Sequence, residues 1–133
     1  MLFAWPIRAG DFFEVTYTHS LNLSPVTDVI EWNGDDLTVT KSIFKTFGAG
    51  IPTPVDAVGS ELLFMGDHYE LIGINKHMPG FSIMTQQTPN QKITFNKHEV
   101  YLLDIIELGA PVYITVKRVP FIMRAAAITF VWV

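Results

Sequence analysis

A histidine and a serine stand side by side where an alternating segment ends, at His19 and Ser20. A serine nucleophile needs a base within hydrogen-bond reach of its hydroxyl. Adjacent residues of a strand point to opposite faces, so these two side chains cannot form a catalytic dyad with each other. We expect Ser20 to bond to the turn backbone. For His19 two interpretations stay open, a hydrogen-bonded position at the strand end and a ligand-binding or proton-handling group.

The other histidines are His68, His77 and His98, and none of the four has the spacing of a helical HExxH motif or of an H-x-H strand pair. Carboxylates could join them only by convergence in space, and the candidates are Asp28, Glu31, Asp56 and Asp104. The chain has no cysteine, which excludes disulfides, thiolate metal sites and thiol catalysis. We therefore predict neither a metal nor a cofactor.

A loop rich in glycine and proline covers residues 47–54, beginning Phe47-Gly48-Ala49-Gly50. It lacks the third glycine and the following helix of a dinucleotide-binding fingerprint. Two close glycines can still form a tight turn, or bring backbone N–H groups near a small anion. Loops of this kind often carry function, which makes Phe47, Gly48 and Gly50 candidate binding residues.

The composition fits one folded domain. The chain has 133 residues, of which 49% are hydrophobic and only 17% charged, so disorder is excluded. Its net charge of -4 offers no general basic field for nucleic acid. Met1 to Ile7 lacks the length, basic start and cleavage site of a signal peptide, so we expect no leader within this segment.

Alternation predicts strands that would position these candidates. In residues 11–18, Phe13, Val15 and Tyr17 share one face. Residues 26–32 and 37–44 flank Asn33-Gly34, which predicts an antiparallel hairpin with a type I′ turn. In the second of these runs, Leu37, Val39 and Ile43 alternate with a polar set made of Thr38, Thr40 and Ser42.

Further short strands are expected at 61–65 and 69–74 around Gly66, at 81–85 after Pro79-Gly80, and at 92–96, 100–104 and 112–117. The apolar segment 119–133 predicts a final strand or a short helix, too short to span a membrane. About eight or nine short strands predict an all-β fold, a single-domain antiparallel β-sandwich or partly open barrel. Exposed strand edges and the apolar C-terminus make a homodimer an expectation.

Several short motifs occur together in order: Gly10-Asp11-Phe12, Tyr17-Thr18-His19-Ser20, Pro25-Val26 followed by Asp28, and the run 44–52. This succession resembles DUF1850, a small bacterial family, whose pattern runs G-D-x-F, Y-x-H-S, P-V-x-E and F-x-x-F-G-A-G-x-P. The resemblance is clearest over residues 7–52 and thinner through residues 53–118. Asp28 stands where the family pattern usually has Glu, which keeps the charge but shortens the side chain.

The resemblance implies an extracytoplasmic domain, often with an N-terminal membrane anchor, encoded beside permeases of the TRAP transporter class, especially the TAXI type. It also implies a permease or solute receptor as partner and carboxylate solutes as the ligand class. Our first hypothesis is a non-catalytic accessory or binding module in which His19, Ser20, Asp28 and the loop from Phe47 to Gly50 converge at one end.

Two alternatives remain. One is a hydrolytic or metal-assisted enzyme that uses His19, Asp28 and His98, which requires these side chains to lie within about 3 Å of one another around a pocket. The other is a purely structural role, in which the same polar residues only hold the loop against the sheet.

Overall fold

The computed structural model describes residues 2–18, 24–45, 59–85, 91–107, 109–118 and 126–132. Within these ranges the chain forms eleven strands and one short helix. In chain order they are β1 (Leu2–Ile7), β2 (Phe12–Thr18), β3 (Pro25–Trp32), β4 (Leu37–Phe44), β5 (Glu61–Phe64), β6 (Tyr69–Met78), β7 (Gly80–Met84), β8 (Lys92–Phe95), β9 (His98–Tyr101), α1 (Leu102–Ile105), β10 (Pro111–Arg118) and β11 (Ala126–Trp132).

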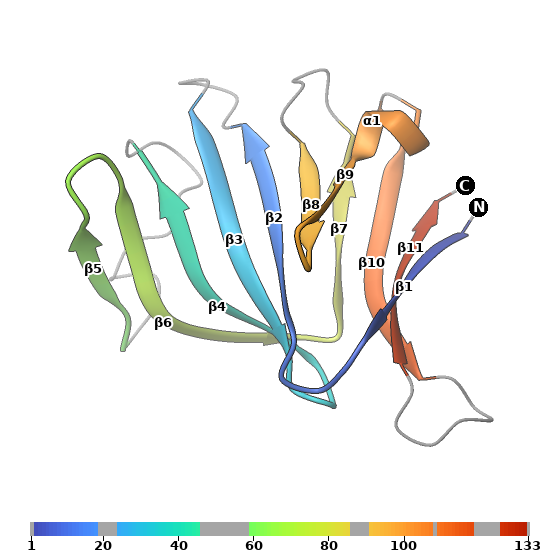
Figure 1. Cartoon of the computed structure of the whole chain (residues 1–133), viewed down its shortest axis with the longest axis horizontal. Coiled ribbons are helices and arrows are strands. Elements are labelled where there is room, and N and C mark those ends of the chain that lie inside the picture. Colours follow the sequence, from blue (N-terminus) through green and yellow to red (C-terminus); the bar gives the residue numbers. More distant parts are fainter. Residues whose placement is uncertain are drawn as a thin grey trace.

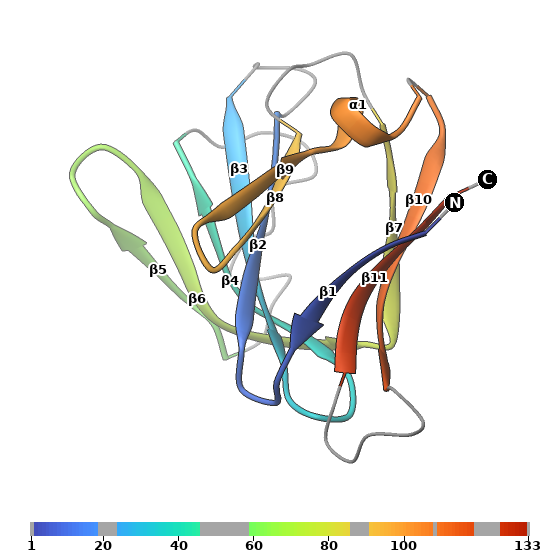
Figure 2. The same ribbon diagram turned by 45° about the vertical axis from the view of Figure 1, so that its right-hand side comes forward.

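Within the described ranges the strands form two separate antiparallel sheets, which confirms the predicted all-β sandwich. The large sheet has the order β5-β6-β4-β3-β2-β8-β9, and the small sheet has the order β1-β11-β10-β7. Figures 1 and 2 show that β5 and β6 lie at the flank of the large sheet farthest from β10 and β11. The two ends of the chain lie together, because β1 pairs with β11 from Leu2↔Val131 to Ile7↔Ala126.

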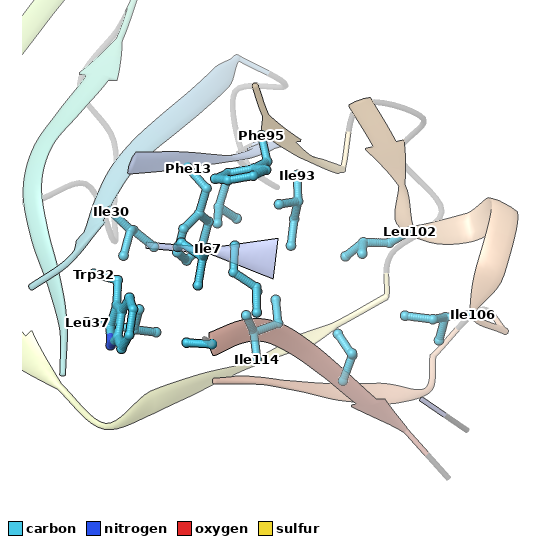
Figure 3. Close-up of a cluster of buried hydrophobic side chains, with 14 residues drawn as sticks. Ile7, Phe13, Ile30, Trp32, Leu37, Ile93, Phe95, Leu102, Ile106 and Ile114 are labelled. Carbon is cyan, nitrogen blue, oxygen red and sulfur yellow. The ribbon is translucent and has the colours of Figure 1, made fainter. Parts of the chain in front are cut away.

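The main hydrophobic core lies between the two sheets. Phe13, Ile30 and Trp32 enter it from the large sheet, and Val112 and Ile114 from the small sheet, all at most 7% exposed (Figure 3). A smaller cluster of Val26, Phe44 and Leu71 belongs to the large sheet alone. Because both sheets contribute to the main core, neither one buries its apolar face without the other.

The helix α1 replaces the end of the strand predicted at 100–104. Strand β9 ends at Tyr101, and one helical turn follows. This turn places Leu102 and Ile106, four residues apart, on the same side, and both are buried in the main core. The backbone N–H of Leu102 donates to the carbonyl oxygen of Gln91 at 3.0 Å, which fixes the start of the helix.

The N- and C-terminal strands raise the strand number above the expected eight or nine. Strand β1 was not predicted, because Pro6 interrupts a short apolar run; it is an edge strand, where proline is tolerated. For the C-terminal segment the strand is confirmed over Ala126–Trp132. Residues Ala126 and Ala127 favour a helix by propensity, but here they pair on both sides, with β1 and β10.

The predicted hairpin at Asn33-Gly34 joins β3 and β4, although its turn is not type I′. Within the described residues, only Gly34 of this loop has a positive φ, 98°. The loop instead closes around the Asn33 side chain, whose Oδ1 accepts from the backbone N–H groups of Asp35 and Asp36. The two successive positive φ angles that a type I′ turn requires occur instead at Asn96 and Lys97, with values of 50° and 69°. These residues join β8 to β9, where Phe95 pairs with His98.

The chain passes from the large sheet to the small one at Pro79, between β6 and β7 (Figure 1). A hydrogen bond holds this corner, and tight packing restricts the residue that follows Pro79. The Thr115 hydroxyl donates to the Pro79 carbonyl oxygen at 2.9 Å. A Cβ on Gly80 would lie 2.5 Å from the Tyr113 hydroxyl oxygen and 2.8 Å from the Ile114 carbonyl oxygen, so this position leaves no room for a side chain.

Candidate functional site

Strand β3 turns one carboxylate toward the interior of the sandwich. Asp28 pairs with Val15 on β2 and with Ser42 on β4, and Val15 belongs to the buried core. Residues that pair directly across an antiparallel sheet share a face. Asp28 therefore lies on the inner face of the large sheet, although a polar residue in an alternating strand usually points outward.

A bulge in β4 brings Ser42 to this carboxylate. The pairs Val29↔Lys41 and Ile30↔Val39 leave Thr40 without a partner on β3, and its hydroxyl donates to the Val29 carbonyl oxygen at 3.1 Å. One extra residue reverses the alternation beyond it. Ser42, which the alternation of the sequence groups with Thr38 and Thr40, therefore faces inward and has no exposed surface.

Two hydroxyl groups hold the carboxyl group of Asp28. The Ser42 Oγ donates to Asp28 Oδ1 at 2.8 Å. The Tyr17 side chain, on the neighbouring strand β2, forms a second hydrogen bond to Asp28. The three residues come from three adjacent strands and together form a polar group, Tyr17-Asp28-Ser42, on an otherwise apolar inner face.

Burial changes the ionisation of this group. It raises the pKa of Asp28 above its usual value, and the hydrogen bond from Ser42, the charge of Lys76 and the hydrogen bond from Tyr17 oppose that rise only in part. The pKa of Tyr17 is also raised, first by burial and then by the charge and hydrogen bond of Asp28. Tyr17 therefore remains a donor at physiological pH.

Asp28 and Tyr17 line a cavity of about 360 Å³ between the sheets. Most of its other walls are apolar: Ile30, Val39 and Met78 contribute from the large sheet, and Phe81, Ile83 and Met84 from β7. Gln91 fixes the end of β7, because its Nε2 donates to the Met84 carbonyl oxygen at 2.8 Å. A cavity of this size, apolar with a few placed polar groups, has the character of a small-molecule site.

Of the predicted binding residues, the structure describes Asp28. His19, Ser20, Phe47, Gly48 and Gly50 lie outside the described residues, so their convergence with Asp28 stays a prediction. Sequence reasoning missed Ser42, because the bulge that turns this residue inward cannot be recognised from the alternation of the sequence. It also missed Gln91, for which the sequence carries no signal, and the part that Tyr17 plays, although Tyr17 belongs to the motif that pointed to His19.

Asp28 and His98 do not form a common site. His98 is on β9, three strands away from β3 in the large sheet, which corresponds to about 14 Å at the usual strand spacing. Its ring lies against Trp5, with 5.0 Å between the ring centroids. Of the three side chains that the enzyme alternative names, Asp28 and His98 are thus on separate strands, and His19 lies outside the described residues.

The other described histidines make local contacts. His68 pairs with Asp67 and approaches Glu70, and His77 Nδ1 lies 3.0 Å from Asp36 Oδ1. Across the described ranges, no group of three or more histidine, aspartate or glutamate side chains is arranged to hold a metal ion. In the same part of the chain, no helix has both the length and the apolar character needed to cross a membrane.

Most of the chain matches the model of a known protein family. Residues 13–102 match the family model of DUF1850, described as a domain of unknown function. The matched region runs from the second residue of β2 to the first residue after β9 and includes all three members of the Tyr17-Asp28-Ser42 group. It starts after the Gly10-Asp11-Phe12 motif and ends at residue 102, so it lies within residues 7–118, over which the resemblance was predicted. No curated protein and no solved structure matches the chain. Because the match covers more than half of its residues, the chain belongs to the DUF1850 family.

Proposed function

We propose that this protein is a non-catalytic binding module that holds a small, largely apolar ligand between its two sheets. The observation that carries the proposal is the cavity of about 360 Å³ with the Asp28 carboxyl group in its wall. Burying a carboxyl group opposes folding unless hydrogen bonds compensate, so its position in an apolar cavity is consistent with a role in binding.

The experiment is a thermal-shift screen of organic acids, amino acids, amines and neutral apolar compounds. A ligand that binds only the folded chain raises its unfolding temperature. At a saturating ligand concentration we expect this increase to be at least about 2 °C. Val39→Phe places a ring in the cavity and should abolish the shift. Thr94→Phe is the control, because Thr94 pairs with Glu14 on the outer face of the large sheet.

Two results would count against a binding role. One is that no compound of any class stabilises the wild-type chain. The other is that Val39→Phe and Thr94→Phe respond to a stabilising compound as the wild type does, because the ligand would then bind away from the cavity. Circular dichroism spectra of both variants establish that each is folded before the comparison is made.

We further propose that the module acts outside the cytoplasm, as an accessory of a TRAP-type solute transporter of the TAXI class. Its support is the family resemblance alone. The expected partner is the permease or its solute receptor. Affinity capture of the permease from detergent-solubilised membranes, together with gel filtration of the chain mixed with the purified receptor, tests this association. Absence of a complex in both experiments would remove the transporter role and leave the ligand-binding role in place.

A further inference from the structure

We propose that the ligand of the inter-sheet cavity carries a primary amine at one end of an apolar body, and that its ammonium group binds the Asp28 carboxylate. The inference rests on the proposed binding function, because it names the chemistry of that same ligand. It also differs from the carboxylate solutes that the family resemblance implies.

The charge of the cavity wall is the first argument. Asp28 is the one charged side chain among the described residues that line the cavity. An ionised carboxylate only accepts hydrogen bonds, so its best partner is a cationic donor. A ligand carboxylate would instead place two like charges close together in a poorly solvated space, which is unfavourable.

The second argument is the incomplete compensation of that charge. Within the described ranges no lysine, arginine or histidine forms an ion pair with Asp28. Its contacts are the hydroxyl of Ser42, at 2.8 Å, and the hydroxyl of Tyr17. Two carboxylate oxygens have lone pairs for about four donors, so acceptor capacity remains for an ammonium group.

The nearest cation does not replace such a partner. Lys76, on β6, lowers the pKa of Asp28 through its charge, but the effect of burial is larger and the pKa stays raised. The Lys76 side chain is exposed and is not part of the cavity wall. A cation inside the cavity would act on Asp28 at shorter range and in a lower dielectric.

The third argument is the shape of the rest of the cavity. Val39, Ile83 and Phe81 give it aliphatic and aromatic walls, and Met78 and Met84 add flexible side chains that adapt to different apolar groups. A body without polar groups would bury its surface there with no unpaired donors or acceptors. The cavity thus combines one acidic anchor with an apolar volume, which complements an amphipathic amine.

The test uses three ligands with the same hydrocarbon chain, n-octylamine, 1-octanol and octanoate, titrated calorimetrically into the whole chain at neutral pH. We expect the amine to bind at least about tenfold more tightly than the alcohol, and octanoate to bind most weakly. Asp28→Asn keeps the size of the side chain and one accepting oxygen, but it replaces the other oxygen by an amide donor and removes the charge. It should lower the affinity for octylamine at least about tenfold and change that for octanol less than about twofold.

Asp35→Asn is the matched control, since Asp35 is an exposed residue of the β3–β4 loop, and it should bind octylamine as the wild type does. Equal affinity for all three ligands, or an amine preference that survives Asp28→Asn, would overturn the amine inference and leave the binding function standing. Tightest binding of octanoate would overturn it in favour of an anionic ligand. If none of the three binds, the amine inference fails, and the broader screen with Val39→Phe decides the binding function separately.

Discussion

Asp28 occupies a position that alternation reserves for an apolar side chain, on the inner face of β3 between Val26 and Ile30. Its two hydroxyl partners, Tyr17 and Ser42, are on β2 and β4, the strands on either side of β3. Both hydrogen bonds therefore require that β2 and β4 pair with β3 in the observed register. The same group that forms the candidate binding anchor is therefore sensitive to small changes in strand pairing.

The raised pKa of Asp28 makes folding stability depend on pH. Between the usual aspartate range and the raised pKa, the folded chain binds more protons than the unfolded chain. Stability from this group is therefore present at low pH and lost as the pH rises through that interval. Asp28→Asn removes the ionisation, so its unfolding temperature relative to the wild type should increase from acidic to neutral pH. Thermal unfolding by circular dichroism measures this, and a pH-independent difference would contradict it.

A second titrating contact behaves in the opposite sense. The hydrogen bond with His77 and the one from Asn33 lower the pKa of the partly exposed Asp36. Stability from Asp36 is present above its unfolded pKa and is lost as the pH falls through the folded value. We expect His77→Ala to raise the pKa of Asp36 toward its usual value in a carboxyl-carbon NMR titration. The matched change His98→Ala should not, and an unchanged Asp36 in His77→Ala would show that Asn33 alone is responsible.

At the level of single elements, the bulge at Thr40 decides which side chains of β4 meet the cavity. Beyond it, Ser42 and Phe44 face inward and Lys41 faces outward, where its Nζ lies 3.0 Å from Glu70 Oε1. A regular strand would have exposed Ser42 and left Asp28 without its hydrogen bond at 2.8 Å. The bulge at Thr40 thus places Ser42 where it can donate a hydrogen bond to Asp28.

The corner at Pro79-Gly80 gives a prediction about one strand. In Gly80→Ala the new Cβ meets Tyr113 and the Ile114 backbone at distances below 3.0 Å, so the pairing of β7 with β10 must shift. We expect a loss of about 1–3 kcal/mol in the free energy of unfolding, the usual cost of overpacking. Denaturant unfolding measures it.

Two further variants separate the causes of that loss. Ser82→Ala, at an exposed position of the same strand, should change the free energy of unfolding by less than about 0.5 kcal/mol. Combining Gly80→Ala with Tyr113→Ala removes the contact with the ring but not the contact with the Ile114 carbonyl, so it should recover only part of the loss. Full stability of Gly80→Ala alone would show that the corner is looser than the structure describes.

The whole molecule depends on a core that both sheets share, and this makes the single-domain prediction testable. Phe13 lies in the large sheet and Ile114 in the small one, and both belong to the same buried cluster. Phe13→Ala should cost about 3–5 kcal/mol and Ile114→Ala about 2–5 kcal/mol. Each should lower one common transition, seen at the same temperature by far-UV and near-UV circular dichroism. Separate transitions for the two variants would indicate independently folding sheets.

Much of the strand content could be predicted from the sequence, because alternation and turn residues are local signals. The strands around Asn33-Gly34 and Gly66 pair as expected, and the β-sandwich follows from their number and length. The family was also recognisable from short motifs in the first part of the chain, and the match to residues 13–102 confirms it.

What the sequence alone determined was therefore where strands form and which class of fold they build. The tertiary structure decided the rest: that Ala126 and Ala127 join a strand between two others, that Ser42 turns inward, and that Asp28 lines a cavity opposite β7. The physical reason is range. Propensity and alternation act over a few neighbouring residues, whereas register, bulges and the packing of one sheet on another depend on contacts between residues far apart in the chain.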